Sequence, residues 1–333
     1  MIHGRDTTGD LTVVVIGLNS AHTLERCFRS LQRAIGALES DVRVLYVDGG
    51  SRDESTAIAR RFGAEVIQLV TARPTASKGR NAGWRAATTP LVQFVDSDTA
   101  LAPEWLEQAT RAIQADDRIA SVFGQLQESN SSGSIYNEVC GCDWYIPPGD
   151  WRMCGGNALF RLNALREVDG SDEALAAGEE ADLCWRLRQR GWRIVCVDAI
   201  MAHHDLGMSS LGAYWKRAVR SGYAYAEIGL RFARTSDPMW LRELIRNLAL
   251  PPVGLLLAAA AALRAGHTGL FALAVVVVAL LAWKFRALRH RVPSARLRAL
   301  YLAHLGFIRL PLFVGALKYL LGRGSERRTT VEG

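Results

Sequence analysis

The first 115 residues alternate between apolar runs and segments whose apolar residues recur at helical spacing. The run LTVVVIG at residues 11–17 is rich in β-branched residues, as in a strand that is buried on both faces of a sheet. Strands joined by helices of roughly ten to fifteen residues form right-handed βαβ units and a mainly parallel sheet. The pattern therefore predicts an α/β fold. The predicted strands are 11–17, 42–47, 64–70 and 91–95, and the predicted helices are 24–38, 53–62, 77–87 and 103–115.

Polar side chains stand at the carboxyl ends of three predicted strands. Asn19 follows the first strand, Asp48 follows the second, and Asp96 and Asp98 follow the fourth. Ligands of such sheets bind beyond the carboxyl ends of the strands, so these residues are expected at one edge. Their grouping predicts a site for a polar, anionic ligand.

The segment Asp96-Ser97-Asp98 is the most informative of these strand ends. Carboxylates at the end of a buried strand are costly unless they are paired, and Mg²⁺ or Mn²⁺ prefers oxygen ligands and bridges to phosphate oxygens. A pair of turn-forming aspartates is the alternative interpretation. The sequence contains neither GxGxxG nor GxxxxGK[ST], which disfavours the nucleotide-binding folds that use those loops.

Further segments follow in order after the strand that ends before Asn19. They are YVDGGSRDES (46–55), KGRNAGWRAA (78–87), FVDSD (94–98), GGNALFR (155–161), GEEADLCWRLRQRGWRI (178–194) and a histidine at 203. This ordered series resembles the family 2 glycosyltransferases over residues 11–230. The resemblance implies a GT-A fold, the Rossmann-like sheet of nucleotide-diphospho-sugar transferases, and inverting sugar transfer. It also implies a catalytic domain at 1–230, with a nucleotide-sugar half at 11–98 and an acceptor half at 99–230.

The resemblance also implies the residues that bind the donor, which is a nucleotide sugar. Asp48, with Asn19 nearby, falls where the family contacts the base, while Lys78 and Arg80 fall where it holds the nucleotide or diphosphate. Asp96 falls toward the ribose or the metal. A UDP-sugar is favoured, with GDP- or dTDP-sugars as alternatives.

A divalent cation, Mg²⁺ or Mn²⁺, is implied at the same motif. Asp98 falls on the direct metal ligand of the family, with Asp96 and His203 as further contacts. The neighbouring His204 is expected not to bind the metal.

The predicted catalytic segment departs from the family pattern, which usually reads Glu-Asp-x-Asp-Leu. Residues 179–183 read Glu-Glu-Ala-Asp-Leu. A positioned carboxylate can take the proton of the acceptor hydroxyl, so Glu180 is expected to be the general base, with Glu179 as the competing assignment. A solvated first turn of a helix, favoured by the helix dipole, is the alternative interpretation.

Further residues are expected on the acceptor side. The pair Gly155-Gly156 would let the backbone approach a sugar closely, although two glycines also suit a plain turn. Asp182 has a second interpretation, since Arg186 lies four residues later, at ion-pair spacing on a helix. The acceptor-side residues are Trp151, Gly155, Gly156, Asn157 and Asp182.

The charge of the chain is unevenly distributed. Residues 1–230 contain 24 Lys and Arg against 29 Asp and Glu, and residues 231–333 contain 16 against 4. The basic residues of the tail flank apolar runs, which argues against nucleic acid as a partner and favours an anionic membrane surface. Residues 231–333 are therefore predicted to be a membrane-associated helical tail.

Within this tail, residues 248–283 are predicted to form a helical hairpin. Segments 248–263 and 265–283 lack a formal charge, and a helix needs about 20 residues to cross a bilayer. Positive charges on both flanks predict that the flanks and the catalytic domain face the cytoplasm. Residues 299–321 are predicted to be an amphipathic, interfacial or re-entrant helix, and a buried soluble hairpin is the alternative for 248–283.

The predicted function is metal-dependent, inverting transfer of a single sugar at the cytoplasmic face of the membrane. The acceptor is expected to be a lipid-linked saccharide, in the synthesis of exopolysaccharide or cell-envelope glycan. The Gln-x-x-Arg-Trp motif of processive relatives is absent. The alternatives are a non-catalytic nucleotide-sugar-binding membrane partner and a sugar-nucleotide pyrophosphorylase, and the sequence does not indicate an oligomeric state.

Overall fold

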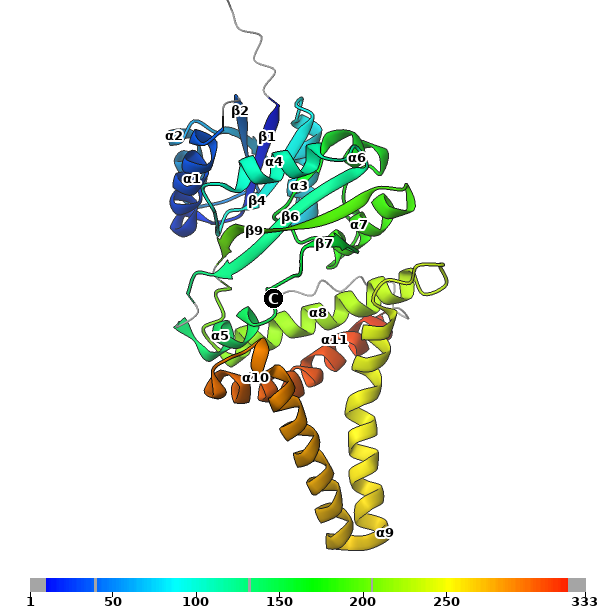
Figure 1. Ribbon diagram of the computed structural model, residues 1–333. Helices are drawn as coiled ribbons and strands as arrows, with labels where there is room; N and C mark the ends of the chain where they lie inside the picture. Colours follow the sequence, from blue (N-terminus) through cyan, green and yellow to red (C-terminus); the bar gives the residue numbers. More distant parts are fainter. Residues whose placement is uncertain (1–9, 39–40, 131–132, 205, 323–333) are drawn as a thin grey trace, which may run out of the picture. The chain divides into compact units, whose positions relative to one another are not determined.

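The computed structural model describes residues 10–38, 41–130, 133–204 and 206–322, and the chain divides into two compact units (Figure 1). The first unit comprises Met1–Ser129, Trp144–Leu175 and Glu179–Asp205. The second comprises Asn130–Asp143, Ala176–Gly178 and Leu206–Gly333. The predicted domain boundary at residue 230 is therefore wrong. The helix Leu211–Arg231 belongs with the tail because it packs on the last helices of the chain.

The first unit contains the predicted alternation of strands and helices. Its strands are β1 (Leu11–Gly17), β2 (Val42–Asp48), β3 (Glu65–Gln68), β4 (Leu91–Asp96), β5 (Thr99–Leu101), β6 (Ile119–Glu128), β7 (Gly149–Trp151), β8 (Leu159–Arg161) and β9 (Arg193–His204). Its helices are α1 (Ala21–Gly36), α2 (Ser55–Arg61), α3 (Ala76–Ala86), α4 (Trp105–Gln114), α6 (Leu162–Glu167) and α7 (Glu179–Gln189).

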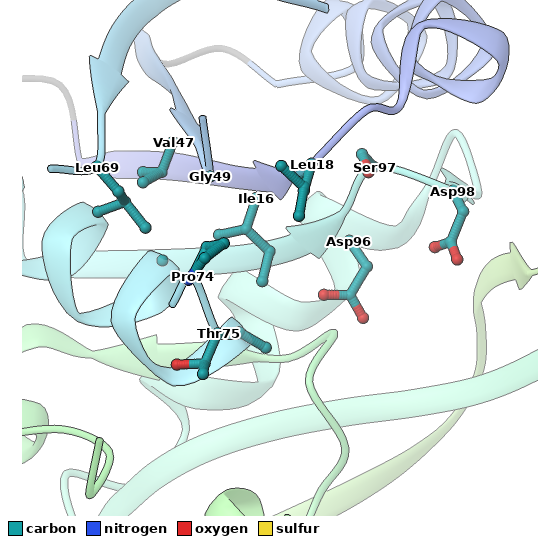
Figure 2. A pocket seen from close by; sticks show the side chains of 13 residues that line it. Ile16, Leu18, Val47, Gly49, Leu69, Pro74, Thr75, Asp96, Ser97 and Asp98 are labelled. Atoms are coloured by element: carbon teal, nitrogen blue, oxygen red, sulfur yellow. The ribbon is translucent and has the colours of Figure 1, made fainter. Parts of the chain in front are cut away.

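These strands form one mixed sheet in the order β3-β2-β1-β4-β8-β6-β9-β5, with β7 paired to β9. Strands β3, β2, β1 and β4 are parallel, as predicted, whereas β8 is antiparallel to both β4 and β6. The carboxyl ends of β1, β2 and β4 line one cavity (Figure 2). The sheet therefore provides the binding edge that the sequence predicts.

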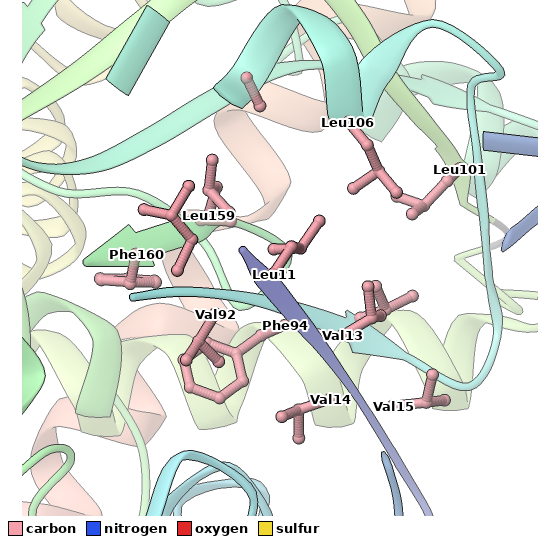
Figure 3. Packing of buried hydrophobic residues seen from close by; sticks show 14 of the residues in the cluster. Leu11, Val13, Val14, Val15, Val92, Phe94, Leu101, Leu106, Leu159 and Phe160 are labelled. Carbon is pink, nitrogen blue, oxygen red and sulfur yellow. The ribbon is translucent and has the colours of Figure 1, made fainter. Parts of the chain in front are cut away.

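The core of the first unit is built on the central strands (Figure 3). Val13, Val14 and Val15 are completely buried, as expected for a strand covered on both faces. A Cβ added to Gly83 would lie 2.1 Å from a methyl carbon of Val14, so α3 approaches β1 closely only because that residue is glycine. This contact fixes α3, the helix that carries Arg80.

The second unit is helical. It contains α5 (Ile135–Gly141), α8 (Leu211–Arg231), α9 (Leu241–Ala287), a short 3₁₀ turn (Leu288–His290), α10 (Ala295–Phe307) and α11 (Arg309–Gly322). Glycines let α8 and α11 touch, since a Cβ on Gly222 would lie 2.1 Å from the Leu312 carbonyl oxygen. On the other helix, a Cβ on Gly315 would lie 2.0 Å from the Val219 carbonyl oxygen.

Helix α9 folds back on itself as the predicted hairpin (Figure 1). Its helical backbone is interrupted at Ala265 and Gly266, directly after the break at residue 264 between the two uncharged segments. Apolar side chains on both arms are exposed, with Leu255 at 73% and Phe271 at 71%. Two segments of the described chain, Leu241–His290 and Ala295–Gly322, are long and apolar enough to cross a membrane, judged by length and composition alone.

The expected single helix over 299–321 is wrong. Two helices, α10 and α11, cover this stretch and meet at Ile308. Pro311 lies in the first turn of α11, where its missing N–H costs no helical hydrogen bond. The proline thus starts a new helix.

Candidate active site

The loop after β1 is tied to the loop after β2 by Asn19. Asn19 has a positive φ of 50°, a conformation that asparagine tolerates better than most residues. Its N–H donates to the Ser51 hydroxyl at 2.8 Å, and its side-chain oxygen accepts from the Arg52 N–H at 2.9 Å. Asn19 therefore shapes the mouth of the cavity through these two contacts.

Asp48 and Lys78, which the sequence predicts to bind the donor, are both engaged with nearby loops. The Asp48 carboxylate is completely buried and accepts from the N–H groups of Gly50 and Ser51, at 3.0 and 2.9 Å. The Lys78 ammonium donates to the Thr71 hydroxyl at 3.0 Å and to a backbone carbonyl at 2.9 Å. Both side chains hold the loops around the cavity in shape.

The cavity has a volume of about 250 Å³ and changes character along its length. Figure 2 shows Val47 and Leu69 at one end, Ile16 in the middle and the carboxylates of Asp96 and Asp98 toward the other end. A flat apolar group suits the first end, and a cation with its anionic partner suits the second. The remaining lining residues are Gly17, Leu18, Gly49, Pro74, Thr75, Ala76, Gly79 and Ser97.

Asp96 is held by two buried neighbours. The Asn157 side-chain oxygen accepts from the Asp96 N–H at 2.8 Å, and its amide nitrogen donates to the Asp96 carboxylate at 3.2 Å. Arg80 donates to the other carboxylate oxygen at 2.9 Å. Asn157 was predicted to lie on the acceptor side. In the structure its side chain contacts Asp96 and orients that carboxylate.

Arg80 links Asp96 to the predicted catalytic carboxylates. Its second terminal nitrogen lies 3.5 Å from a Glu179 carboxylate oxygen and 3.4 Å from one of Glu180. The Arg80 side chain is only 7% exposed. The guanidinium predicted to hold the diphosphate is therefore occupied by three carboxylates.

Gly156 makes room for this guanidinium. A Cβ added there would lie 1.9 Å from an Arg80 terminal nitrogen, whereas a Cβ on Gly155 would meet no atom within 4 Å. The Gly-Gly loop was expected to let backbone approach a sugar. At Gly156 the backbone instead lies against the Arg80 guanidinium. Gly155 keeps open space beside it.

Glu180 has the properties of a base that works near neutral pH. Burial and, after it, the negative charge of Glu179 raise the pKa of Glu180 to about 7, against the opposing effect of Arg80. The Glu180 side chain is 27% exposed and that of Glu179 is 8% exposed. Of the two carboxylates, Glu180 is thus the more accessible to an acceptor.

His204, not His203, lies beside Asp98. The His204 Nε2 is 3.3 Å from an Asp98 carboxylate oxygen, and its ring meets the edge of Trp144 with the centroids 5.9 Å apart. Adjacent residues of a strand point to opposite faces, and His203 is exposed. Of the two histidines, His204 and not the predicted His203 therefore lies beside Asp98.

Asp98 itself is suited to hold a cation. Burial raises its pKa, but hydrogen bonding and charge from His204 outweigh this, and the net pKa lies below the ordinary value. No group of three or more His, Cys, Asp or Glu side chains in the described ranges is arranged to hold a metal ion. A cation at Asp98 would therefore complete its shell with water and phosphate oxygens, as Mg²⁺ and Mn²⁺ commonly do, and His204 could join it only as a neutral imidazole.

Two predicted acceptor residues lie elsewhere. Asp182 is completely buried and pairs with Arg186 at 2.7 Å, which confirms the ion-pair interpretation and leaves its carboxylate out of the cavity. Trp151 pairs with Ile194 near the start of β9, whereas His204 ends that strand, and the indole N–H donates to a nearby backbone carbonyl. Neither residue is brought together with Asp98.

Comparison with known proteins identifies the fold and the family. Residues 12–168 match the family described as Glycosyl transferase family 2. The pre-mycofactocin glycosyltransferase of Mycobacterium tuberculosis is 29% identical over 226 residues, which cover 61% of this chain and 45% of that protein. The succinoglycan biosynthesis protein ExoA of Rhizobium meliloti is 26% identical over 213 residues, which cover 58% of this chain and 62% of that protein. The chain thus spans about half the length of these relatives.

Solved structures share the architecture. A mannosyltransferase from Pyrobaculum calidifontis, solved with GDP-Man and Mn²⁺, superposes with a TM-score of 0.68 at 18% identity, over 94% of this chain and 87% of that chain. Residues 1–349 of S. aureus TarS superpose with a TM-score of 0.51 at 16% identity, over 96% and 93%. With the ordered motifs and the mixed sheet, these matches show that the chain has a GT-A fold and carries a glycosyltransferase family 2 domain over residues 12–168.

Proposed function

We propose that the chain transfers a single sugar, with inversion, from a nucleotide-sugar donor to an acceptor hydroxyl. The observation that carries the proposal is the linked set of Asp96, Arg80 and Glu180, which continues from the acidic end of the cavity. A carboxylate with a pKa of about 7 thus stands one side chain away from the donor cavity. This is the arrangement that an acid-base transfer between two bound substrates needs.

In the proposed reaction, Glu180 accepts the proton of the acceptor hydroxyl as the hydroxyl oxygen attacks the anomeric carbon. The new carbon–oxygen bond forms on the face opposite the diphosphate. The bond from the anomeric carbon to the diphosphate oxygen breaks, and the electron pair leaves with the diphosphate. One displacement inverts the anomeric centre, so no covalent sugar–enzyme intermediate is required.

The donor is proposed to lie in the cavity, with its base at the apolar end and its diphosphate toward Asp98. Asp98 and His204 would hold a divalent cation, which supplies positive charge that stabilises the leaving diphosphate. The mannosyltransferase solved with GDP-Man and Mn²⁺ supports this pairing of donor and cation. A UDP-sugar remains the favoured donor, and GDP- and dTDP-sugars are the alternatives to test.

The acceptor is proposed to be a lipid-linked saccharide. The exposed apolar arms of α9 would insert into the cytoplasmic membrane, and positive residues on both flanks would keep the catalytic unit on the cytoplasmic side. The similarity to ExoA, a succinoglycan biosynthesis protein, supports a place in polysaccharide or envelope glycan synthesis.

The test is release of nucleoside diphosphate by the purified full chain from a panel of nucleotide sugars, with and without Mn²⁺. Asp98→Ala is expected to abolish cation-dependent release, while Asp117→Ala, at a fully exposed carboxylate, leaves it unchanged. Activity that survives Asp98→Ala would overturn the cation site. Nucleotide binding without turnover, across many acceptors, would instead favour a nucleotide-sugar-binding protein.

A further inference from the structure

A polar cluster in the second unit lies where α9 begins. It consists of Arg246 and Asn247 from α9, Arg309 from the start of α11 and Tyr225 from α8. Arg309 donates to the Asn247 side-chain oxygen at 2.7 Å, and Asn247 is completely buried. The residues come from three helices that pack together within this unit.

The cluster gathers positive charge without a carboxylate partner. The positive charges of Arg246 and Arg309 repel each other, and each of them lowers the pKa of the Tyr225 phenol. The negative charges of Glu243 and Asp143 also act on that phenol and raise its pKa. However, over the described ranges no carboxylate lies within the 4.0 Å ion-pair distance of either guanidinium. Two positive charges that repel each other are stabilised by an external anion that binds beside both.

The amide nitrogen of Asn247 points to the same conclusion. This nitrogen is buried and has no hydrogen-bond partner in the part of the chain that the structure describes. It belongs to the amide whose oxygen takes the Arg309 hydrogen bond, so it lies beside that guanidinium. Buried polar groups are normally satisfied, and an orphaned donor next to two arginines is suited to an anionic oxygen.

The position of the cluster along α9 indicates the kind of anion. Asn247 directly precedes residue 248, where the uncharged arm of the hairpin begins. Trp240 packs against Tyr225 edge to face, with centroids 4.9 Å apart. Tryptophan and tyrosine mark the level of lipid headgroups, just outside the hydrocarbon.

We propose that Arg246, Arg309, Asn247 and Tyr225 bind the phosphate group of a membrane lipid. The proposal rests on the membrane attachment proposed above. The phosphate comes either from the lipid that carries the acceptor saccharide or from the headgroup of an anionic phospholipid. In both cases the guanidinium groups and the amide donate hydrogen bonds to phosphate oxygens.

The first experiment measures thermal protection of the full chain in detergent micelles by a short-chain polyprenyl phosphate. The probe is compared with the uncharged polyprenol of equal length. Arg246→Gln and Arg309→Gln are expected to weaken phosphate-dependent protection about tenfold each, since each removes one charge-assisted contact. Arg242→Gln, at an exposed arginine one turn earlier on α9, removes the same charge and should have no such effect.

A second variant probes the buried amide. Asn247→Asp replaces the orphaned nitrogen with a carboxylate oxygen, which repels phosphate and pairs with Arg309. Protection by the phosphate probe should fall at least tenfold, and the melting temperature without probe should not fall. Because the Arg246 side chain is exposed, Arg246→Gln is expected to leave the fold intact, so a loss of protection in this variant reports on phosphate binding and not on unfolding.

The outcomes separate the two sources and the two proposals. Protection by polyprenyl phosphate but not by phosphatidylglycerol assigns the acceptor lipid, and equal protection by both assigns phospholipid headgroups. Equal protection by polyprenol and polyprenyl phosphate, or an equal loss in Arg242→Gln, overturns the site. The experiment measures binding of a lipid probe in detergent micelles and requires neither bilayer insertion nor sugar transfer. Failure of insertion or of transfer would therefore contradict the proposed function, and the binding result would still be valid.

Discussion

Two arginines, the buried Arg80 and the partly buried Arg309, occupy opposite electrostatic settings in the two units. In the first unit, Arg80 is surrounded by the carboxylates of Asp96, Glu179 and Glu180. In the second unit, Arg309 contacts a neutral amide and is repelled by Arg246. The same guanidinium chemistry thus organises acidic groups in one place and, in the proposed lipid site, binds an anion in the other. An arginine near a predicted anionic ligand therefore need not be a ligand contact, and its carboxylate neighbours decide its role.

The largest expected effect comes from removing the proposed base. Glu180→Gln keeps the size of the side chain but removes the proton acceptor, so kcat is expected to fall roughly a thousandfold. The fall in kcat is measured as the steady-state rate of nucleoside diphosphate release. Glu179→Gln serves as the matched control and should retain most of the activity. The reverse ranking would assign the base to Glu179.

The contrast between the two arginines can be tested directly by replacing each of them with glutamine and comparing the losses of stability. Arg80→Gln leaves three carboxylates without their cation, and the expected loss of unfolding free energy is about 3 kcal/mol. Arg309→Gln removes one hydrogen bond and relieves repulsion, so its cost is at most about 1 kcal/mol. Thermal melting of both variants in the same detergent checks the difference. Equal losses would contradict the contrast between the two settings.

The neighbouring glycines offer a finer test of the Arg80 position. Gly156→Ala forces its new methyl group against the guanidinium, so Arg80 must shift and the carboxylates it holds must shift with it. Activity is expected to fall about tenfold, because a small misplacement of reacting groups is enough to slow the reaction. Gly155→Ala is the control, since its methyl group enters open space. Kinetics of the two variants should differ clearly, and matching kinetics would count against the role of Arg80.

The smallest expected effect is on the pH dependence of transfer. Glu180 must be deprotonated to accept a proton, so activity is expected to rise with pH through about 7 and to level off above it. The charge of Glu179 raises the pKa of Glu180, so Glu179→Gln should move this rise to lower pH. A pH profile of kcat/KM shows both effects. An unchanged midpoint in that variant would mean that burial alone sets the pKa.

Local patterns predicted the parts of the fold that depend on neighbours in sequence. The four strands from residue 11 to residue 96, their joining helices and the Asp182–Arg186 pair follow from periodicity and from i, i+4 spacing. The turn of the hairpin likewise follows from a break between two uncharged runs.

Contacts between distant residues could not be predicted in this way. Alternation along a strand implies that only one of His203 and His204 can face Asp98. The register of β9 against β5, which pairs His204 with Thr99, decides which one. The roles of Gly156 and Asn157 depend on a guanidinium and a carboxylate that lie more than sixty positions earlier. Helix α8 looked like the end of the catalytic domain because its partner, α11, lies some ninety residues later.

The turn at Ala265 and Gly266 has a consequence for how the chain is made. If α9 inserts as proposed, only the few residues around this turn, with one arginine at 264, must be moved across the bilayer. Everything before and after the hairpin stays in the compartment where the ribosome works. The two arms can therefore enter together as a preformed pair, and the sugar-transfer unit folds without any segment of it being exported.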